Sequence, residues 1–193
     1  TGDNGAARRP YPPLREAKSS IYEGGHREPF VARWPGKIKP GTVSHSIICL
    51  NDFFATCADI LKADLPANAA EDSVSFLPNL LNKQDAPVRQ AIINQASEGL
   101  AIRQGFWKYI VFRNGTRELY NLKEDISETK DVAKKNTAVV DRLEKLMQSY
   151  FDRGRSTPGP VQKKEFELPF GRSAEKKRNK KNKENKESSS KNK

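Results

Sequence analysis

Short apolar runs separated by polar positions are most regular between residues 91 and 122. Rich in Ile, Val, Leu and aromatic residues, these runs predict four strands, at 91–95, 100–103, 107–112 and 117–122. The pair Asn114-Gly115 is typical of a hairpin turn. In the third run, apolar side chains stand at both odd and even positions, so both faces of the sheet carry apolar weight. The pattern predicts a small antiparallel sheet with one face packed on a helix.

An apolar stripe of helical period follows the sheet. A helix beginning at Asn136 or Thr137 would gather one set of side chains on a single face, namely Val139, Val140, Leu143, Leu146, Met147 and Tyr150. We expect this helix to cover the sheet. The run Pro158-Gly159-Pro160 then ends regular structure.

The pattern before residue 91 is less regular. Apolar runs predict strands at 30–34 and 43–50, and a short helical element at 76–81. Asn51 or Asp52 can cap a helix between them. Its apolar face would be formed by Phe53, Phe54, Cys57, Ile60 and Leu61. If that face points inward, Cys57 is a small apolar core residue. Asp52 and Asp59 lie off the face and are expected to be solvated or capping acids.

Composition changes the picture mainly at the end of the chain. The 193 residues carry 35% hydrophobic and 31% charged residues, with a net charge of +11. Ten Lys/Arg and three Glu between residues 172 and 193 account for +7 of it, which leaves +4 for the rest. This tail lacks apolar residues after Ala174, and we expect it to be disordered. A solvating tail is favoured over a nucleic-acid or polyanion contact, because no aromatic residue interleaves the charges.

Other compositional signals are weak. Cys49 and Cys57 give no disulfide framework, and no apolar run reaches the roughly 18 residues of a membrane span. No signal peptide is visible, which leaves the compartment open.

The opening 37 residues concentrate the candidate chemistry. Asp3 and Asn4 offer adjacent carboxylate and amide oxygens, the ligands of hard cations such as calcium or magnesium, but Asn4-Gly5 is also a common turn pair, and from these residues alone a plain turn is favoured over a metal site. Lys18 could hold an anionic substrate as a point charge, against the alternative of an exposed loop lysine. His26 is a lone histidine, and we assign it no catalytic role.

These residues resemble the sulfatase family. The resemblance is carried by Asp3-Asn4-Gly5, then by Leu14-Arg15-x-x-Lys18-x-x-x-Tyr22-Glu23-Gly24-Gly25-x-Arg27-x-Pro29-Phe30, and then by Ala32-Arg33-Trp34-Pro35-Gly36. It continues more weakly to about residue 150. It implies that Asp3 and Asn4 bind a divalent cation, usually calcium with magnesium possible, and that Lys18 contacts the sulfate group. Glu16, Ala17 and Ser19 stand where many relatives have glycine, which weakens the transfer to Lys18.

The resemblance also implies an architecture. We expect an α/β chain forming the C-terminal part of an alkaline-phosphatase-like sulfatase fold. Its segments would be the end of the catalytic domain (1–82), a C-terminal subdomain of antiparallel sheet plus helix (83–155), an extended arm (156–171) and the disordered basic tail (172–193). Arg103 and Lys108 could border a substrate pocket, although a solvated sheet face is favoured for both.

The family's nucleophile is missing from the sequence. Sulfatases make formylglycine from a Cys/Ser-x-Pro-x-Arg motif, and neither cysteine lies in one; Ser156-Thr-Pro-Gly-Pro160 lacks the arginine. We therefore expect the C-terminal portion of a calcium-dependent sulfuric ester hydrolase, with the N-terminal half and its formylglycine encoded upstream. The chain alone would be inactive towards its sulfated small-molecule or glycan substrate.

Three alternatives stay open. The chain could be a non-catalytic remnant, a binding module with a polyanion-binding basic tail, or part of a related phosphohydrolase. Export to the periplasm or the extracellular space is an expectation from the resemblance alone.

Overall fold

A four-stranded antiparallel sheet lies at the centre of the structure, a computed structural model that describes residues 1–7, 9–83 and 88–163. The strands are adjacent in chain order: β1 (Ile92–Ala96), β2 (Gly99–Gln104), β3 (Trp107–Phe112) and β4 (Arg117–Asn121). All four strands predicted from the sequence are confirmed. Gly115, in the turn before β4, has a φ of +90°, a conformation that glycine adopts without steric cost.

The strand register sorts the side chains into two apolar faces. Ile93 pairs with Ile102, Ile102 with Tyr109, and Tyr109 with Leu119. Since directly opposed residues point to the same side of a sheet, these four form one row across it. The other face carries Ala101, Ile110 and Tyr120.

Helix α4 (Thr137–Arg153) covers the first face, as predicted. The helix and the sheet share one buried cluster, made up of Ala91, Leu100, Ile102, Tyr109, Val111, Leu119, Val140, Leu143, Met147 and Tyr150. Asn136 stands at the N-cap position, but its amide donates to Val132 O at 3.0 Å instead of capping the helix. The helix ends at Arg153, and Gly154, which follows it, has a φ of +64°.

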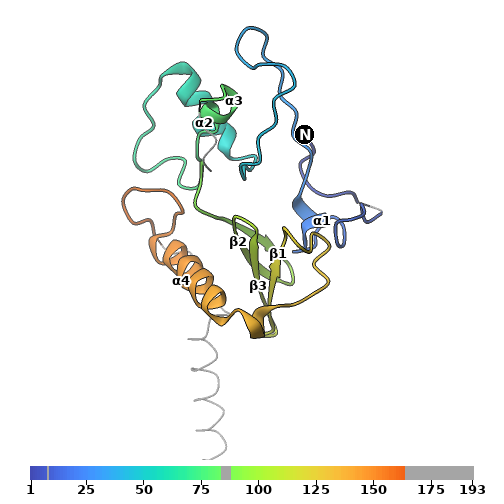
Figure 1. Cartoon of the computed structure of the whole chain (residues 1–193). Coiled ribbons are helices and arrows are strands. Elements are labelled where there is room, and N and C mark those ends of the chain that lie inside the picture. The colour runs from blue at the N-terminus through green and yellow to red at the C-terminus, as the bar shows by residue number, and fades with distance from the viewer. Residues whose placement is uncertain (8, 84–87, 164–193) are drawn as a thin grey trace, which may run out of the picture.

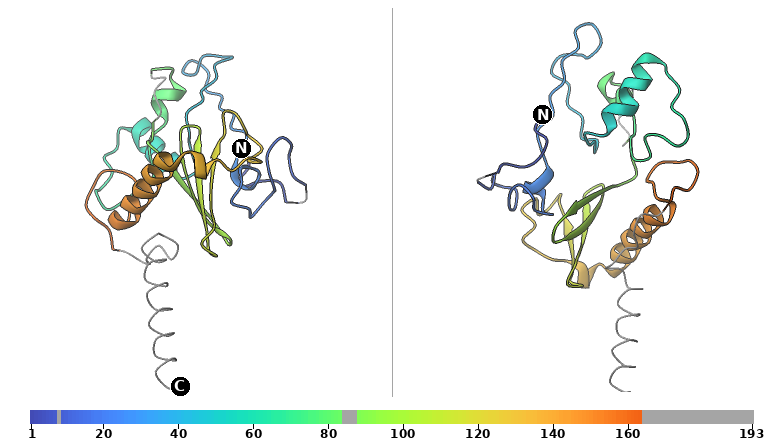
Figure 2. Two further views of the ribbon diagram at one scale, coloured as in Figure 1. Left: turned by 60° about the horizontal axis from the view of Figure 1, so that its bottom comes forward. Right: turned by 180° about the vertical axis from the view of Figure 1, so that it is seen from behind.

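The opening segment of the chain covers the second face, an arrangement that the sequence pattern did not predict. Ile21 and Tyr22 pack against Ala101, Ile110 and Tyr120. Immediately after them, helix α1 (Glu23–His26) lies on the side of the sheet opposite α4 (Figures 1 and 2). The structure is therefore layered, with the sheet enclosed between α4 and the opening segment.

Helix α2 (Asp52–Leu61) is confirmed, but the prediction of its buried face is wrong. Asp52 and Thr56 are buried, whereas Phe54 is 58% and Leu61 76% exposed, and Cys57 is exposed as well. The condition under which Cys57 would be a core residue is therefore not met. The Phe53 ring packs edge-on against Phe30 and Phe76, with ring centroids 5.8 and 5.3 Å apart. The face formed by Phe53, Phe54, Ile60 and Leu61 nevertheless keeps each of these residues at least 40% exposed, and it is called the apolar face of α2 below.

Polar contacts explain why the opposite face of α2 is buried. The Asp52 carboxylate accepts hydrogen bonds from Val74 N at 2.9 Å and Cys49 N at 2.8 Å, and it pairs with the Arg89 guanidinium. The hydroxyl of Thr56 accepts from Phe76 N at 3.1 Å. Asp52 is thus a buried anchor and not a solvated acid, while Asp59 accepts from the Ser75 hydroxyl at 2.6 Å. The side chain of Asn51, at the N-cap position, makes no capping bond.

The predicted strands at 30–34 and 43–50 do not form among the described residues. A strand needs a neighbouring strand to take up its backbone hydrogen bonds, and neither segment has one in the described structure. The short helical element is confirmed as α3 (Leu77–Leu80). Within the described ranges, every helix is too short or too polar to cross a membrane. The basic tail and the arm beyond residue 163 lie outside the described residues.

Candidate functional site

Backbone hydrogen bonds join the first two parts of the opening motif. Gly5 N donates to Gly25 O at 3.0 Å, which ties Asp3-Asn4-Gly5 to the glycine pair of α1. Lys18 N donates to Ala6 O at 3.1 Å, one residue beyond the same motif. These bonds place the neighbourhoods of Asn4 and Lys18 side by side, although 13 residues separate them in the sequence.

The close approach of these segments explains the glycine at position 5. A Cβ atom added there would lie 1.9 Å from Gly24 O, well inside any permitted contact. Since the obstacle is backbone, it cannot swing aside as a side chain would. The Asp-Asn-Gly motif can therefore lie against α1 only with glycine at this position.

A cavity of about 520 Å³ opens where the opening segment meets β1. The opening segment lines it with Asn4, Lys18, Ser19, Ser20, Gly25 and His26. The strand and the turn that follows it line the opposite wall with Asn94, Gln95, Ala96 and Ser97. Two of the three predicted site residues, Asn4 and Lys18, therefore share one cavity, which we call the Lys18 cavity.

Asp3 is exposed and does not line the Lys18 cavity. Neither its carboxylate nor the Asn4 amide makes a hydrogen bond to a described residue, so both oxygens are available to a hard cation. Calcium takes six to eight oxygen ligands, and two adjacent residues supply only part of such a shell. The described residues contain no group of three or more His, Cys, Asp and Glu that could hold a metal. The donor chemistry fits a partial site, and the metal and sulfate roles stay predictions.

His26 reaches the cavity from α1 and is held by a buried carboxylate. Its Nε2 lies 3.3 Å from Glu23 Oε1, and Glu23 is completely buried. Glu23 also accepts from Lys108 Nζ at 3.1 Å and from Arg103 Nη1 at 3.1 Å. Lys108 lies 2.8 Å from Glu128 Oε1 on its other side, and Glu23 N donates to Glu128 Oε2 at 2.6 Å. We call Glu23, Lys108, Glu128 and Arg103 the buried ionic network.

This network corrects the expectation for Lys108 on β3. The lysine is completely buried and makes ion pairs with two buried carboxylates, so it is neither solvated nor exposed to a pocket. Arg103 is 19% exposed and pairs with Glu23 from β2. A buried charge is tolerated only when paired, which explains the position of Lys108 between Glu23 and Glu128.

The two carboxylates of the network respond to burial in opposite ways. Burial alone would raise the pKa of Glu23, but the hydrogen bond from His26 and the charges of Lys108 and Arg103 lower it below its ordinary value. Burial raises the pKa of Glu128, and the charge of Lys108 does not fully offset the effect. Glu23 is therefore the firmly ionised member of the pair.

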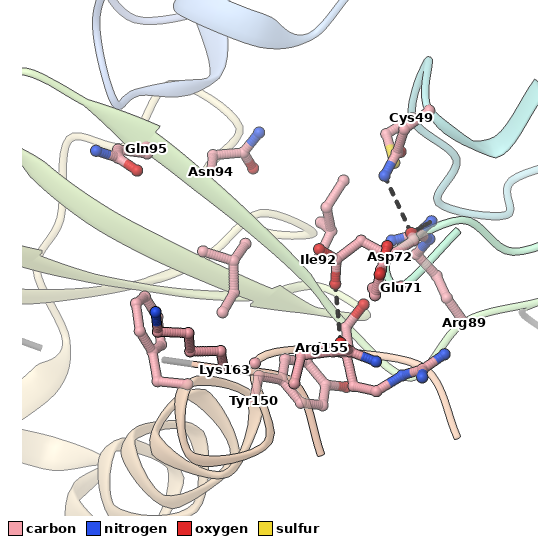
Figure 3. Close-up of a pocket in the computed structure, with 16 residues that line it drawn as sticks. Cys49, Glu71, Asp72, Arg89, Ile92, Asn94, Gln95, Tyr150, Arg155 and Lys163 are labelled. Carbon is pink, nitrogen blue, oxygen red and sulfur yellow. Dashed lines mark hydrogen bonds between the residues drawn. The ribbon is translucent and has the colours of Figure 1, made fainter. Parts of the chain in front are cut away.

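A second and larger cavity, of about 830 Å³, lies between β1, the start of α2 and the end of α4. Three of its charged side chains, those of Asp72, Arg89 and Arg155, bond to backbone groups of the surrounding walls (Figure 3). Arg155 donates to Ala67 O at 2.7 Å, and Asp72 Oδ1 accepts from Ser156 N at 2.8 Å. Such satisfied contacts are typical of structural polar clusters, and so the smaller Lys18 cavity is the better candidate for a site.

Sequence reasoning missed three residues that line the Lys18 cavity, His26, Asn94 and Gln95. Asn94 and Gln95 interrupt an otherwise apolar strand, and adjacent polar residues in such a run are a signal of function that could have been used. His26 gave no usable signal, because its neighbours Glu23 and Lys108 are brought together only by the fold.

The sequence is similar to known proteins over most of its length. Residues 17–153 match the family described as N-sulphoglucosamine sulphohydrolase, C-terminal. An N-acetylgalactosamine-6-O-sulfatase of Bacteroides thetaiotaomicron is 38% identical over 151 residues, which cover 70% of this chain and 29% of that protein.

Two solved structures extend the match to the fold. One, from a study of glycosaminoglycan metabolism by B. thetaiotaomicron, has a TM-score of 0.63 at 38% identity and covers 70% of this chain and 31% of the other. Another, in complex with its substrate D-glucosamine-2-N,6-O-disulfate, has a TM-score of 0.59 at 27% identity and covers 71% and 31%.

The chain spans about a third or less of each of these proteins. The match nevertheless includes Lys18, α1, the four strands and all of α4. The sheet with its covering helix is the C-terminal part of an alkaline-phosphatase-like fold, and this chain belongs to the sulfatase family, as a match to its C-terminal portion.

Proposed function

We propose that this chain forms the C-terminal part of a hydrolase of sulfate esters, and that the Lys18 cavity is the part of the active site that it contributes. The observation that carries the proposal is the convergence of Asn4 and Lys18 on one cavity, fixed by the backbone bonds of Gly5 and Lys18. The named activities of the relatives support a sulfated sugar as the substrate class.

Each residue has a role that its chemistry allows. The Lys18 ammonium would hold the sulfate group as a point charge. Asp3 and Asn4 would supply oxygen ligands to calcium, and that ion would stabilise negative charge on the sulfate oxygens. The nucleophile would come from residues beyond this sequence, because none of the 193 residues forms the motif from which formylglycine is made.

The test compares the 193-residue chain with the complete gene product that carries it. Sulfate release from N-acetylgalactosamine 6-sulfate is measured by ion chromatography, with calcium and with a chelator. We expect turnover by the complete protein only, and a loss of roughly 100-fold or more in Lys18→Ala, the scale of removing one charge-stabilising group.

Metal-dependent turnover by the isolated chain would contradict the proposal that the chain supplies only part of the active site. The absence of sulfate release from a folded complete protein that carries formylglycine would overturn the function itself. Lys145→Ala, on the solvent side of α4, is the matched control and should keep full activity.

A further inference from the structure

We propose that Arg15 is a positioning residue for Lys18: its guanidinium, fixed against Tyr22 and Glu128, holds residues 14–20 in the backbone conformation that brings Lys18 to the cavity. Residues 14–20 are called the Lys18 loop below. The inference rests on the proposed function, because it takes Lys18 as the group that holds the sulfate. Arg15 itself does not line the Lys18 cavity, so it would act through the loop and not on the substrate.

The Lys18 loop has no helix or strand to hold it. None of residues 14–20 belongs to such an element, and Lys18 itself is exposed. Because a lysine side chain is a flexible four-carbon stem, the place of its ammonium depends on how firmly its backbone is held. Glu98, in the turn after β1, holds the far end of the loop by accepting from Ser20 Oγ at 3.3 Å and from Ile21 N at 2.8 Å. The near end needs an anchor of its own.

The Arg15 guanidinium is that anchor. Its Nη1 donates to Glu128 O at 2.7 Å and to the Tyr120 hydroxyl at 3.3 Å. Its central carbon lies 3.7 Å from the centroid of the Tyr22 ring, a cation–π contact. The backbone of Arg15 takes part as well, since its carbonyl oxygen accepts from Gly24 N at 2.9 Å. One residue thus ties the start of the loop to the sheet, to α1 and to the segment after β4.

Glu118 on β4 fixes the two tyrosines that receive Arg15. Its Oε2 accepts from the Tyr22 hydroxyl and from the Tyr120 hydroxyl, each at 2.8 Å. Because Tyr120 gives its proton to Glu118, its oxygen keeps a lone pair for Arg15. Both tyrosines are buried. Arg15 is therefore held by a packed and hydrogen-bonded surface, the kind of support that keeps a functional group in place.

The backbone on either side of Lys18 gives this anchor something to resist. Glu16 has a φ of +61° and Ser19 a φ of +75°. Residues that carry a Cβ atom adopt this left-handed region only at a cost in free energy. Such conformations persist where surrounding contacts hold them. Without the Arg15 anchor, the loop would relax towards ordinary φ values and carry Lys18 away from the cavity.

Sulfate release from N-acetylgalactosamine 6-sulfate by the complete gene product tests the proposal in two backgrounds. Arg15→Met should lower kcat/KM by about 10- to 100-fold, the scale expected when a group at the reacting centre is displaced by about 1 Å. In the Lys18→Ala background the same substitution should change kcat/KM by less than about 3-fold, because the group that Arg15 positions is already gone. Arg142→Met, at an exposed position of α4, is the matched control and should keep full activity.

Two glycines test the conformational part of the proposal. The double substitution Glu16→Gly and Ser19→Gly removes the cost of a positive φ, so the loop has less reason to relax when Arg15 is lost. In this background, the loss caused by Arg15→Met should be smaller than in the wild type by about 3-fold or more. Amide hydrogen exchange of the 193-residue chain gives a readout independent of activity. Exchange at Lys18 should become faster in Arg15→Met and stay as in the wild type in Arg142→Met.

Equal losses from Arg15→Met with and without Lys18 would show that the two residues act independently and would overturn the proposal. An equally large loss in the glycine background would overturn it as well, as would unchanged exchange at Lys18. Failure of the proposed function looks different. A folded complete protein that releases no sulfate, or a fully active Lys18→Ala, removes the function and this inference together, whereas activity lost in Lys18→Ala but kept in Arg15→Met removes the inference alone.

Discussion

Lys108 is the residue that joins the opening segment most directly to the sheet and to the loop after it. It lies on β3 and neutralises Glu23 of the opening segment and Glu128 of the loop after β4. All three side chains are completely buried. Removing the cation would leave two carboxylates facing each other without solvent, a much larger cost than losing a surface ion pair.

Lys108→Met should lower the free energy of unfolding by about 3–5 kcal/mol, the usual cost of breaking a buried pair. Urea denaturation at pH 7 measures the change. Lys145→Met, which removes an exposed lysine of α4, is the control and should stay within about 0.5 kcal/mol of the wild type. Equal effects of the two substitutions would show that the network contributes no stability.

The lowered pKa of Glu23 predicts how stability depends on pH. Because the folded state holds this carboxylate ionised below its ordinary pKa of 4.5, its contribution is present above that pH and is lost as the pH falls below it. The difference in unfolding free energy between the wild type and Glu23→Gln should be largest near pH 7 and shrink below about pH 4.5.

Glu128 should behave in the opposite sense. Its raised pKa means that the folded state takes up this proton before the unfolded state does, so its charge costs stability at pH 7. Glu128→Gln should therefore be less destabilising than Glu23→Gln at pH 7. Glu124→Gln, at an exposed position, is the control and should give a pH profile parallel to the wild type.

At the scale of elements, the sequence predicted correctly those helices and strands whose contacts are made by residues close together in the chain. The strands β1 to β4 and helix α4 form from neighbouring residues in a continuous segment, and their periodicities predicted them correctly. Segments 30–34 and 43–50 have equally apolar sequences, but a strand also requires a pairing partner, which no local pattern reveals.

The candidate site shows the same limit. Asp3, Asn4 and Lys18 could be predicted because they stand at fixed spacing within one motif, and Asn4 and Lys18 line the cavity. Asn94 and Gln95 were missed because they reach the cavity only through the packing of β1 against the opening segment. The burial of Lys108 was missed for the same reason, since its two partners lie 85 residues before it and 20 after it.

The contact between the Asp-Asn-Gly motif and α1 should depend on glycine at position 5. In Gly5→Ala the new methyl group would meet Gly24 O, and the motif would be forced away from α1. Amide hydrogen exchange should become faster at Lys18 and Gly24, while α4 keeps its protection, since the two lie on opposite faces of the sheet.

Gly2→Ala is the matched control for this substitution. A Cβ atom there meets the Glu28 side chain, which is flexible and can move away. Exchange at Lys18 and Gly24 should stay as in the wild type. Unchanged exchange in Gly5→Ala as well would contradict the role assigned to the close approach.

At the scale of the whole molecule, the layered core is shielded from solvent, whereas the apolar face of α2 is exposed to it. The sheet is covered on both faces, whereas Phe53, Phe54, Ile60 and Leu61 are each at least 40% exposed. Contiguous apolar surface of this kind is typical of a surface that is covered in the functional molecule or that associates with copies of itself.

The isolated 193-residue chain should therefore self-associate as its concentration rises, and Phe54→Lys should shift it towards monomer. Sedimentation velocity at several concentrations measures this, and the thermal midpoint should stay nearly unchanged because Phe54 is already 58% exposed. Tyr11→Lys removes an exposed aromatic residue away from α2 and should not alter association. A wild-type chain that is monomeric at every concentration would contradict the prediction.

Because the carboxylate of Glu23 has several partners, it also determines which neighbouring positions tolerate substitution. If His26 is replaced, Glu23 keeps Lys108, Arg103 and Arg27 as partners, so the ionic network retains its charge balance. In a saturation library selected first for folding, position 26 should accept most amino acids and position 23 almost none. A residue that lines the Lys18 cavity could then be substituted freely during evolution, while the buried carboxylate that it contacts could not.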